Sequence, residues 1–277
     1  MKKAVLLFII VLFLCSFGQK QKTWLALGDS ITYLNDHLDE TDNRVTKGYL
    51  TRITEKLPNI NYINQGHNGW TAVNIAKKIE DLGLIRADLY SIFLGTNDWW
   101  HGEPLGTIDD YKNNSGTATV YGAFRVIINK IKSLNQDAKV VLITPMQRTD
   151  FVYIGDAHNN AWGSYKEKEG QSLEQFAEAV KAIAQLEGYP IVDLYHNPDL
   201  DLSKLVKYKR LKDPQTSQYK NYSYPDFIGI PFDPDEDEYP YPPAATHMTY
   251  DGLHPSDAGN QVIADQLLKY FKLTNSH

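Results

Sequence analysis

Cysteine is almost absent from this sequence. Its 277 residues include one cysteine, Cys15, which lies close to the N-terminus. A single cysteine cannot form a disulfide within the chain, so such a bond is excluded as a source of stability. If the N-terminal segment is cleaved beyond Cys15, the remaining chain also has no thiolate for catalysis or metal binding.

Clustered positive charge is also missing. The chain has 28 lysines and arginines against 34 aspartates and glutamates, which gives a formal net charge of -6. Proteins that bind nucleic acid need grouped lysine and arginine side chains to contact phosphates, so we exclude nucleic acid as a partner. The acidic run at residues 233–238 favours a solvated surface over a calcium site, because it lacks the ligand spacing of a calcium loop.

Long apolar runs are limited to the first residues of the chain. Residues 4–14 are apolar and follow a short basic start. This run is too short to cross a bilayer of about 30 Å, and it predicts a secretory signal peptide over residues 1–18, cleaved after Gly18. We therefore expect a secreted or periplasmic protein without a membrane span. The alternative is a lipoprotein anchored through Cys15, which the bulky Leu14 before it disfavours.

Short apolar segments alternate with segments of helical periodicity in the rest of the chain. The predicted strands are residues 23–27, 60–64, 89–94, 139–144 and 190–194, and the predicted helices are residues 48–57, 72–82, 121–134, 172–186 and 255–273. Apolar strands separated by helices are typical of a parallel sheet that is covered on both faces. We expect one α/β domain over residues 19–277, a three-layer α/β/α sandwich around a five-stranded parallel sheet. A long stretch without periodicity, at about 197–249, predicts an insertion with a functional or mobile role.

Polar and glycine-containing segments follow several of these strands. Residues 28–30 follow the first strand, 66–69 the second and 95–98 the third, and residues 251–255 precede the last helix. Ligands of open α/β sheets bind at the carboxyl ends of the strands. We therefore expect these four segments to meet at one rim of the sheet.

The residue types on this rim match the requirements of ester hydrolysis by a serine. Such a reaction needs a hydroxyl, an imidazole base, a carboxylate that orients the imidazole, and donors for the developing oxyanion. Ser30, His254 and Asp251 supply the first three groups. The backbone N–H groups of Ser30 and Gly66 and the side-chain amide of Asn97 are the candidate oxyanion donors.

Together these segments resemble the four sequence blocks of the SGNH hydrolases, the GDSL-type esterases and lipases. The resemblance rests on Gly28-Asp29-Ser30-Ile31, Gly66, Gly95-Thr96-Asn97-Asp98 and Asp251-x-x-His254-Pro255. It implies a flavodoxin-like fold and catalysis without a cofactor. It also implies that Ser30 is the nucleophile, that Gly66 and Asn97 belong to the oxyanion hole, and that Asp251 and His254 are the acid and the base. Ile31 replaces the usual leucine of the first block, a change of shape and not of chemistry.

Other carboxylates and histidines allow competing interpretations. Asp193, at the end of the last predicted strand, is an alternative to Asp251, and Asp98 is expected to bind neighbouring backbone. The scattered histidines form neither an i, i+4 pair nor an H-E-x-x-H pattern, so we expect no metal site. These histidines are His67, His101, His158, His196 and His247.

Aromatic residues are frequent in the segments that follow the predicted strands. Flat rings suit the face of a sugar, whereas a lipase is expected to have a continuous aliphatic groove. The candidate substrate contacts are His67, Trp70, Trp99, Trp100, Trp162 and His247. We therefore expect a serine esterase that removes short acyl groups such as acetyl from carbohydrate.

Three alternatives to this prediction are retained. Within the same reaction class, the enzyme could be a lipase or other acylhydrolase, or a thioesterase, that acts on longer acyl chains. Outside that class, it could be a metal-dependent hydrolase that uses the scattered histidines, or a non-catalytic glycan-binding module. The expected partner in the main prediction is a small-molecule or glycan ester.

Overall fold

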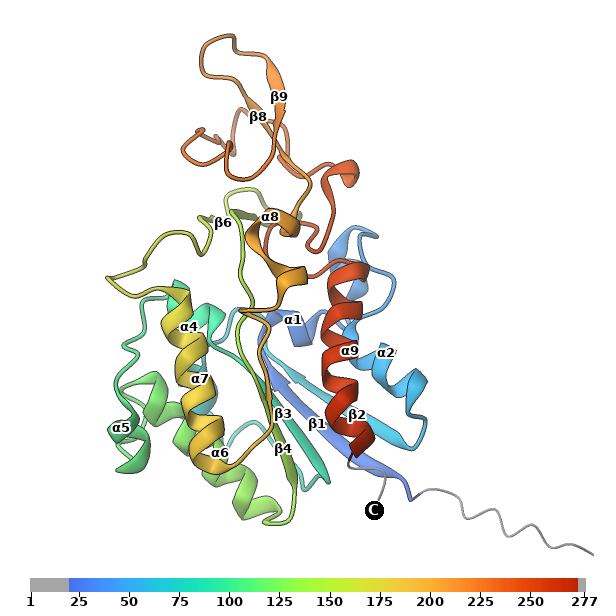
Figure 1. Cartoon of the computed structure of the whole chain (residues 1–277), viewed down its shortest axis with the longest axis vertical. Coiled ribbons are helices and arrows are strands. Elements are labelled where there is room, and N and C mark those ends of the chain that lie inside the picture. The colour runs from blue at the N-terminus through green and yellow to red at the C-terminus, as the bar shows by residue number, and fades with distance from the viewer. Residues whose placement is uncertain (1–19, 274–277) are drawn as a thin grey trace, which may run out of the picture.

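A central sheet of five parallel strands organises the chain (Figure 1). The computed structural model describes residues 20–273, and the strand order in the sheet is β2-β1-β3-β4-β7. The strands are β1 (Lys22–Gly28), β2 (Ile60–Gly66), β3 (Leu89–Phe93), β4 (Lys139–Ile143) and β7 (Ile191–Val192). The prediction of a five-stranded parallel sheet is confirmed. The predicted signal peptide and Cys15 lie outside the described residues.

Helices cover both faces of this sheet. Side chains alternate along β1, so that Leu25 and Leu27 pack into one apolar cluster and Trp24 and Ala26 into another. The first cluster is covered by α3 (Ala72–Lys77), α6 (Val120–Leu134) and α7 (Leu173–Glu187), and the second by α2 (Tyr49–Lys56) and α9 (Asp257–Leu273). The three-layer α/β/α arrangement is therefore confirmed. None of the helices described is long and apolar enough to cross a membrane.

Short helical elements lie near the carboxyl ends of the strands. They are α1 (Ser30–Tyr33), η1 (Leu38–Thr41) and α4 (Thr96–Trp100). A further short helix, α5 (Ile108–Lys112), packs against α6 and α7, where its Tyr111 donates to Glu187 at 2.7 Å. Elements of four or five residues complete barely one turn, so helical periodicity in the sequence cannot reveal them. They matter because α1 and α4 begin within the segments that carry Ser30 and Asn97.

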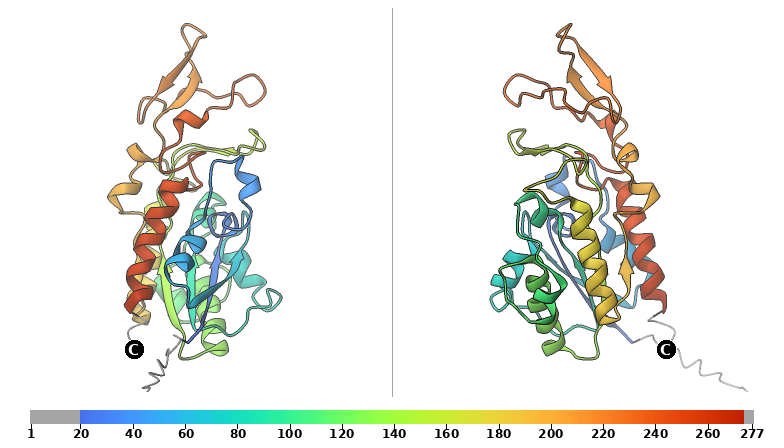
Figure 2. Two further views of the ribbon diagram at one scale, coloured as in Figure 1. Left: turned by 90° about the vertical axis from the view of Figure 1, so that its right-hand side faces the viewer. Right: turned by 60° about the vertical axis from the view of Figure 1, so that its left-hand side comes forward.

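The long stretch before the last helix folds into several short elements. They are η2 (Pro198–Leu200), α8 (Leu202–Leu205), β8 (Lys209–Lys212), β9 (Tyr219–Tyr222) and η3 (Pro243–Ala245). Strands β8 and β9 form an antiparallel hairpin, which projects from one end of the molecule in all three views (Figures 1 and 2). A second small hairpin, β5 (Phe151–Val152) with β6 (Asn160–Ala161), lies between this insertion and the sheet.

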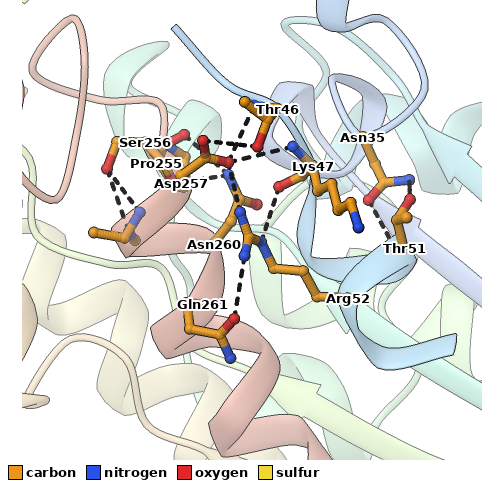
Figure 3. Close-up of polar contacts among 12 residues, drawn as sticks. Asn35, Thr46, Lys47, Thr51, Arg52, Pro255, Ser256, Asp257, Asn260 and Gln261 are labelled. Carbon is orange, nitrogen blue, oxygen red and sulfur yellow. Dashed lines mark hydrogen bonds and ion pairs between the residues drawn. The ribbon is translucent and has the colours of Figure 1, made fainter. Parts of the chain in front are cut away.

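A polar network fixes the start of α9 against α2 (Figure 3). The carboxylate of Asp257, in the first turn of α9, accepts hydrogen bonds from the backbone N–H groups of Thr46 and Lys47 at 3.1 and 3.3 Å. Arg52 of α2 forms an ion pair with Asp257 and also donates to Gln261 at 3.1 Å. A carboxylate near a helix N-terminus is favoured by the helix dipole. The network therefore holds the segment that immediately precedes α9, residues 251–256, at the rim of the sheet.

Candidate active site

Ser30 lies where β1 turns sharply into α1. The side chain of Asp29 caps this helix by accepting the N–H of Ile31 at 3.0 Å. Gly28 allows the turn, because a Cβ at this position would lie 2.1 Å from Oγ1 of Thr32. Burial of Asp29 raises the pKa of its carboxyl group to about 6. The serine hydroxyl is thus placed at the carboxyl end of β1 by groups adjacent to it in the chain.

His254 connects Ser30 with Asp251. Its Nε2 lies 2.9 Å from Oγ of Ser30, and its Nδ1 lies 2.6 Å from Oδ2 of Asp251. The other carboxylate oxygen of Asp251 accepts the backbone N–H groups of Leu253 and His254 at 3.0 and 2.7 Å. With its proton on Nδ1, the imidazole donates to Asp251 and accepts the hydroxyl proton of Ser30. The arrangement is therefore competent for proton transfer from the serine.

Asp193 does not take part in this arrangement. Its carboxylate lies 2.9 Å from Nδ1 of His196 and 3.2 Å from Nζ of Lys181. These contacts lower the pKa of Asp193, although partial burial opposes them. The carboxylate that the structure pairs with His254 is Asp251, so the alternative drawn from the sequence is not supported.

Gly66 does not present a free amide to the rim. Its N–H donates to Oδ1 of Asn64 at 2.8 Å, and a Cβ at Gly66 would lie 2.1 Å from the backbone nitrogen of Tyr33. The glycine is needed for close packing, and its donor is already used. Gly69, three residues further on, lines the same cavity as Ser30 and has a positive φ of 75°. Among the described residues, no acceptor engages the N–H of Ser30 or Gly69.

Asn97 and Asp98, at the start of α4, have different roles. Nδ2 of Asn97 donates to the carbonyl of Trp70 at 3.0 Å, which orients the amide and leaves its second N–H for another acceptor. The carboxylate of Asp98 accepts the N–H groups of Ala72 and Val73 at 2.9 and 3.4 Å, at the start of α3. Complete burial raises the pKa of Asp98 to about 7. The prediction that Asp98 binds neighbouring backbone is confirmed.

A cavity of about 300 Å³ opens beside Ser30 and His254, and we call it the rim cavity. Besides these two residues its wall includes Leu34, Glu40, Asn68, Gly69, Asn97, Trp100, His101, Arg148, Phe151, Tyr153, Asn159, Ala161 and Leu253. Polar and aromatic side chains outnumber aliphatic ones in this wall. The cavity therefore offers hydrogen-bonding groups and ring faces close to the serine, and no continuous aliphatic surface.

The tryptophans expected to contact substrate are distributed differently. Trp100 lines the rim cavity, as the sequence predicts. Trp99 is completely buried, and its Nε1 donates to the carbonyl of Gln171 at 2.9 Å, so it is a core residue and not a substrate contact. Trp162 packs edge-on against Trp100, with ring centroids 4.7 Å apart, and lies outside the wall of the rim cavity.

Three further candidates also lie outside the wall of the rim cavity. His67 and Trp70 stack on each other with ring centroids 4.6 Å apart, and burial lowers the pKa of His67. The carbonyl of His247 accepts the hydroxyl of Ser256, which positions the segment before α9. The structure shows packing and backbone contacts for these residues, and their contact with substrate stays a prediction.

Arg148 lines the rim cavity although it is almost fully buried, and no sequence pattern predicts it there. Its guanidinium lies 4.9 and 4.7 Å from the ring centroids of Trp99 and Trp100, and it donates to the carbonyl of Trp162 at 2.9 Å. Burial lowers the pKa of Arg148 to about 9. A single arginine in a segment without periodicity has no spacing signal, so no pattern could have singled it out.

The scattered histidines do not form a metal cluster. Within residues 20–273, no group of three or more histidine, cysteine, aspartate or glutamate side chains is arranged to hold a metal ion. His158 instead lies 3.2 Å from Asp156 and 3.0 Å from Asp235.

Comparison with known proteins adds independent information. The model of the GDSL-like lipase/acylhydrolase family matches residues 26–262. A solved structure described as a possible lipase from Chitinophaga pinensis is 62% identical and has a TM-score of 0.91, over 93% of this chain and 100% of that chain.

Two acetylxylan esterases share the fold at low identity. One is 21% identical with a TM-score of 0.53, over 90% of this chain and 98% of its own. The other, from Geobacillus stearothermophilus, is 19% identical with a TM-score of 0.51, over 90% of this chain and 94% of its own. A search of curated proteins gave no match.

Proposed function

The chain belongs to the GDSL-like lipase/acylhydrolase family, and on that premise we propose that it hydrolyses carboxylic esters through an acyl-enzyme intermediate on Ser30. The observation that carries the proposal is the chain of two hydrogen bonds, 2.9 Å from Ser30 to His254 and 2.6 Å from His254 to Asp251. Contacts of this length allow the imidazole to take the serine proton while the carboxylate holds its tautomer.

The proposed reaction has two halves. As Oγ of Ser30 attacks the ester carbonyl, His254 takes the hydroxyl proton, and it then returns this proton to the departing alcohol. A water molecule, deprotonated by the same imidazole, then attacks the acyl-enzyme and releases the acid. No cofactor enters either half of this reaction.

The oxyanion of each tetrahedral intermediate needs preorganised donors. We assign this role to the N–H groups of Ser30 and Gly69 and to the free N–H of the Asn97 side chain. Gly69 replaces Gly66 in this assignment, because the amide of Gly66 already donates to Asn64. All three donors belong to residues that line the rim cavity.

The substrate we propose is a short acyl ester, such as acetate, on a carbohydrate. The rim cavity combines the ring of Trp100 with polar side chains, and Leu34 and Leu253 are its only large aliphatic residues within the part of the chain described. Such a wall fits a small acyl group and a hydroxyl-rich alcohol better than a long hydrocarbon chain. The fold shared with two acetylxylan esterases is consistent with this choice.

Initial rates on p-nitrophenyl esters of increasing acyl length test this proposal. We expect acetate to be the best substrate and a fluorophosphonate probe to label Ser30. A preference for chains of eight or more carbons would favour the lipase alternative. Absence of labelling at Ser30 in an active enzyme would contradict the serine mechanism, and persistence of full activity after chelation would exclude a metal-dependent one.

We further propose that residues 1–18 direct secretion and that residues 19–277 form a single domain with an insertion at about 197–249. The apolar run after a basic start supports the first statement. The mass of the native protein distinguishes cleavage after Gly18 from lipidation at Cys15, because a diacylglyceryl group adds a large and characteristic mass.

A further inference from the structure

A second cavity of about 300 Å³ adjoins the rim cavity, and we call it the side cavity. Phe151 of β5 and Ala161 of β6 line both cavities, so the β5–β6 hairpin forms their common wall. The two cavities are therefore neighbours at this hairpin. What the side cavity could hold depends on the chemistry of its remaining residues.

Aromatic rings form much of the wall of the side cavity. Trp162 and Tyr165 come from the segment that follows β6, and Phe232 comes from the insertion. The hydroxyl of Tyr165 donates to Oδ1 of Asp150, which holds the tyrosine ring in a fixed orientation. Rigid ring faces that are partly exposed suit the apolar faces of sugar rings, and they contribute contact area at a small cost in entropy.

Lys209 places a positive charge in the wall of this cavity. It is only 3% exposed, and its ammonium pairs with Oδ2 of Asp150 at 2.9 Å. The rings of Phe227 and Phe232 lie about 6 Å from the ammonium. An ammonium carries three N–H donors, and among the described residues only Asp150 accepts one. Its other two N–H groups have no acceptor among the described residues, so they can bond to water or to the oxygen atoms of a ligand.

Lys209 and Phe232 both belong to the insertion, so the side cavity exists only because the insertion packs on the β5–β6 hairpin. Carbohydrate is the ligand class that matches this combination, since its hydroxyl and ring oxygens accept hydrogen bonds while its C–H faces stack on aromatic rings. A fatty acyl chain would leave the two ammonium donors unsatisfied.

We propose that the side cavity binds the sugar units that adjoin the ester-bearing unit of a glycan substrate. This inference rests on the proposed function, because it extends a substrate that is held at Ser30. It gives the insertion a role in selecting oligomeric over monomeric esters. The stacking surface of Phe232 and the free donors of Lys209 are the groups that would carry this selection.

Kinetics with two substrates test the inference. In Phe232→Ala we expect kcat/KM for acetylated xylohexaose to fall about tenfold through KM, as for a residue that dominates a contact. The kinetics with p-nitrophenyl acetate should not change, because that ester does not reach the side cavity. Exposed Ile228, in the same loop but outside the cavity wall, provides the matched control Ile228→Ala, which should behave as wild type. An unchanged KM for the oligosaccharide, or an equal loss on both esters, would overturn the inference.

A binding measurement separates this inference from the proposed function. Calorimetry on Ser30→Ala protein with xylohexaose, mannohexaose and cellohexaose reports the side cavity without any hydrolysis. We expect at least one of these sugars to bind, and the added change Phe232→Ala to weaken that binding about tenfold. If none binds, the inference fails even where the wild-type enzyme hydrolyses p-nitrophenyl acetate. If no ester is hydrolysed but binding behaves as expected, the proposed function fails and the carbohydrate site stands.

Discussion

The strand-end rim and the insertion differ in how their side chains are held. At the rim, Asp251 and His254 are three residues apart, and both are almost completely buried. The insertion is connected to the rest of the molecule by long-range contacts, such as the ion pair of Lys209 with Asp150 and the hydrogen bond from Tyr239 to the carbonyl of Val152 at 2.8 Å. The reacting groups are therefore placed by local turns at the ends of the sheet, whereas the side cavity depends on the packing of the insertion against the β5–β6 hairpin.

The insertion also has its own small apolar core. Its buried members within the insertion are Val206, Leu211, Phe227, Tyr241 and Ala245, with Val152 contributed by β5. A core of this size supplies little hydrophobic stabilisation compared with the two large clusters that flank the sheet. Substitutions of the catalytic residues at the rim should therefore reduce turnover without unfolding the protein. Substitutions that loosen the insertion should first reduce its local stability and the binding of substrate in the side cavity.

The largest effect we expect is that of Ser30→Ala on turnover. The variant should hydrolyse p-nitrophenyl acetate more than about 10⁴-fold more slowly, because only oxyanion binding and positioning remain. Its thermal unfolding should match that of the wild type, since the lost hydroxyl is not part of the core. Steady-state kinetics and circular dichroism measure the two properties. Wild-type turnover in this variant would remove Ser30 from the mechanism.

The second prediction concerns the carboxylate behind the imidazole. Asp251→Asn should reduce kcat by about 10³- to 10⁴-fold, because an amide cannot hold the same tautomer or stabilise the imidazolium. Asp193→Asn is the matched control, since that carboxylate also ends a segment near the rim but contacts His196 and Lys181 instead. Steady-state kinetics of both variants on the same ester measure the two changes in kcat. Equal losses in the two variants would show that the 2.6 Å contact of Asp251 is not the one that matters.

The sequence predicts the central sheet and its covering helices better than it predicts the contacts of the insertion. All five strands were expected within a few residues of their positions, because buried β-branched runs and helical periodicity agree over long segments. The convergence of Ser30, His254 and Asp251 also followed from the rule that parallel strands present their carboxyl ends at one edge. These features depend on repeating patterns, which a single sequence displays directly.

Other features each depend on a single tertiary contact, and no repeating sequence pattern predicts them. The use of the Gly66 amide by Asn64 and the complete burial of Trp99 are set by tertiary packing. The role of Lys209 likewise depends on Asp150, which is 59 residues away in the chain. Residue type alone therefore placed Gly66 and Trp99 in roles that the packing does not support, and it overlooked Arg148.

The third prediction tests the attachment of the insertion. Lys209→Met should lower the stability of the insertion by about 3 kcal/mol, because the partly buried carboxylate of Asp150 loses its ammonium partner and keeps only the donors of Gly163 and Tyr165. Hydrogen exchange should show this loss at β8 and β9, with little change in β1 and β3. The double variant Asp150→Asn with Lys209→Met should recover part of the loss, since no unpaired charge remains.

Arg210→Met is the control for this measurement. Arg210 lies in the same strand, and its ion pair with Glu238 is exposed on both sides, so its loss should cost about 1 kcal/mol or less. If Lys209→Met accelerates exchange equally in the sheet and in the hairpin, the insertion and the body unfold together. The contrast between the two regions would then be incorrect.

The smallest expected effect concerns the pH dependence of the rim's own stability. Asp98 has a pKa raised from 3.8 to about 7 by burial, so its protonated form is favoured in the folded state. The stability that this preference contributes is fully present below about pH 4 and is lost as the pH rises through 7.

The variant Asp98→Asn tests this contribution, because its side chain does not titrate. Between pH 5 and pH 8 its free energy of unfolding should therefore decline by about 2 to 3 kcal/mol less than that of the wild type. Exposed Asp81→Asn should follow the wild-type curve in urea titrations at the two pH values. If the free energies of unfolding of the wild type and of Asp98→Asn change equally with pH, Asp98 is ionised when it binds the N–H groups of α3. A charged carboxylate, and not a neutral acid, would then stabilise the start of that helix.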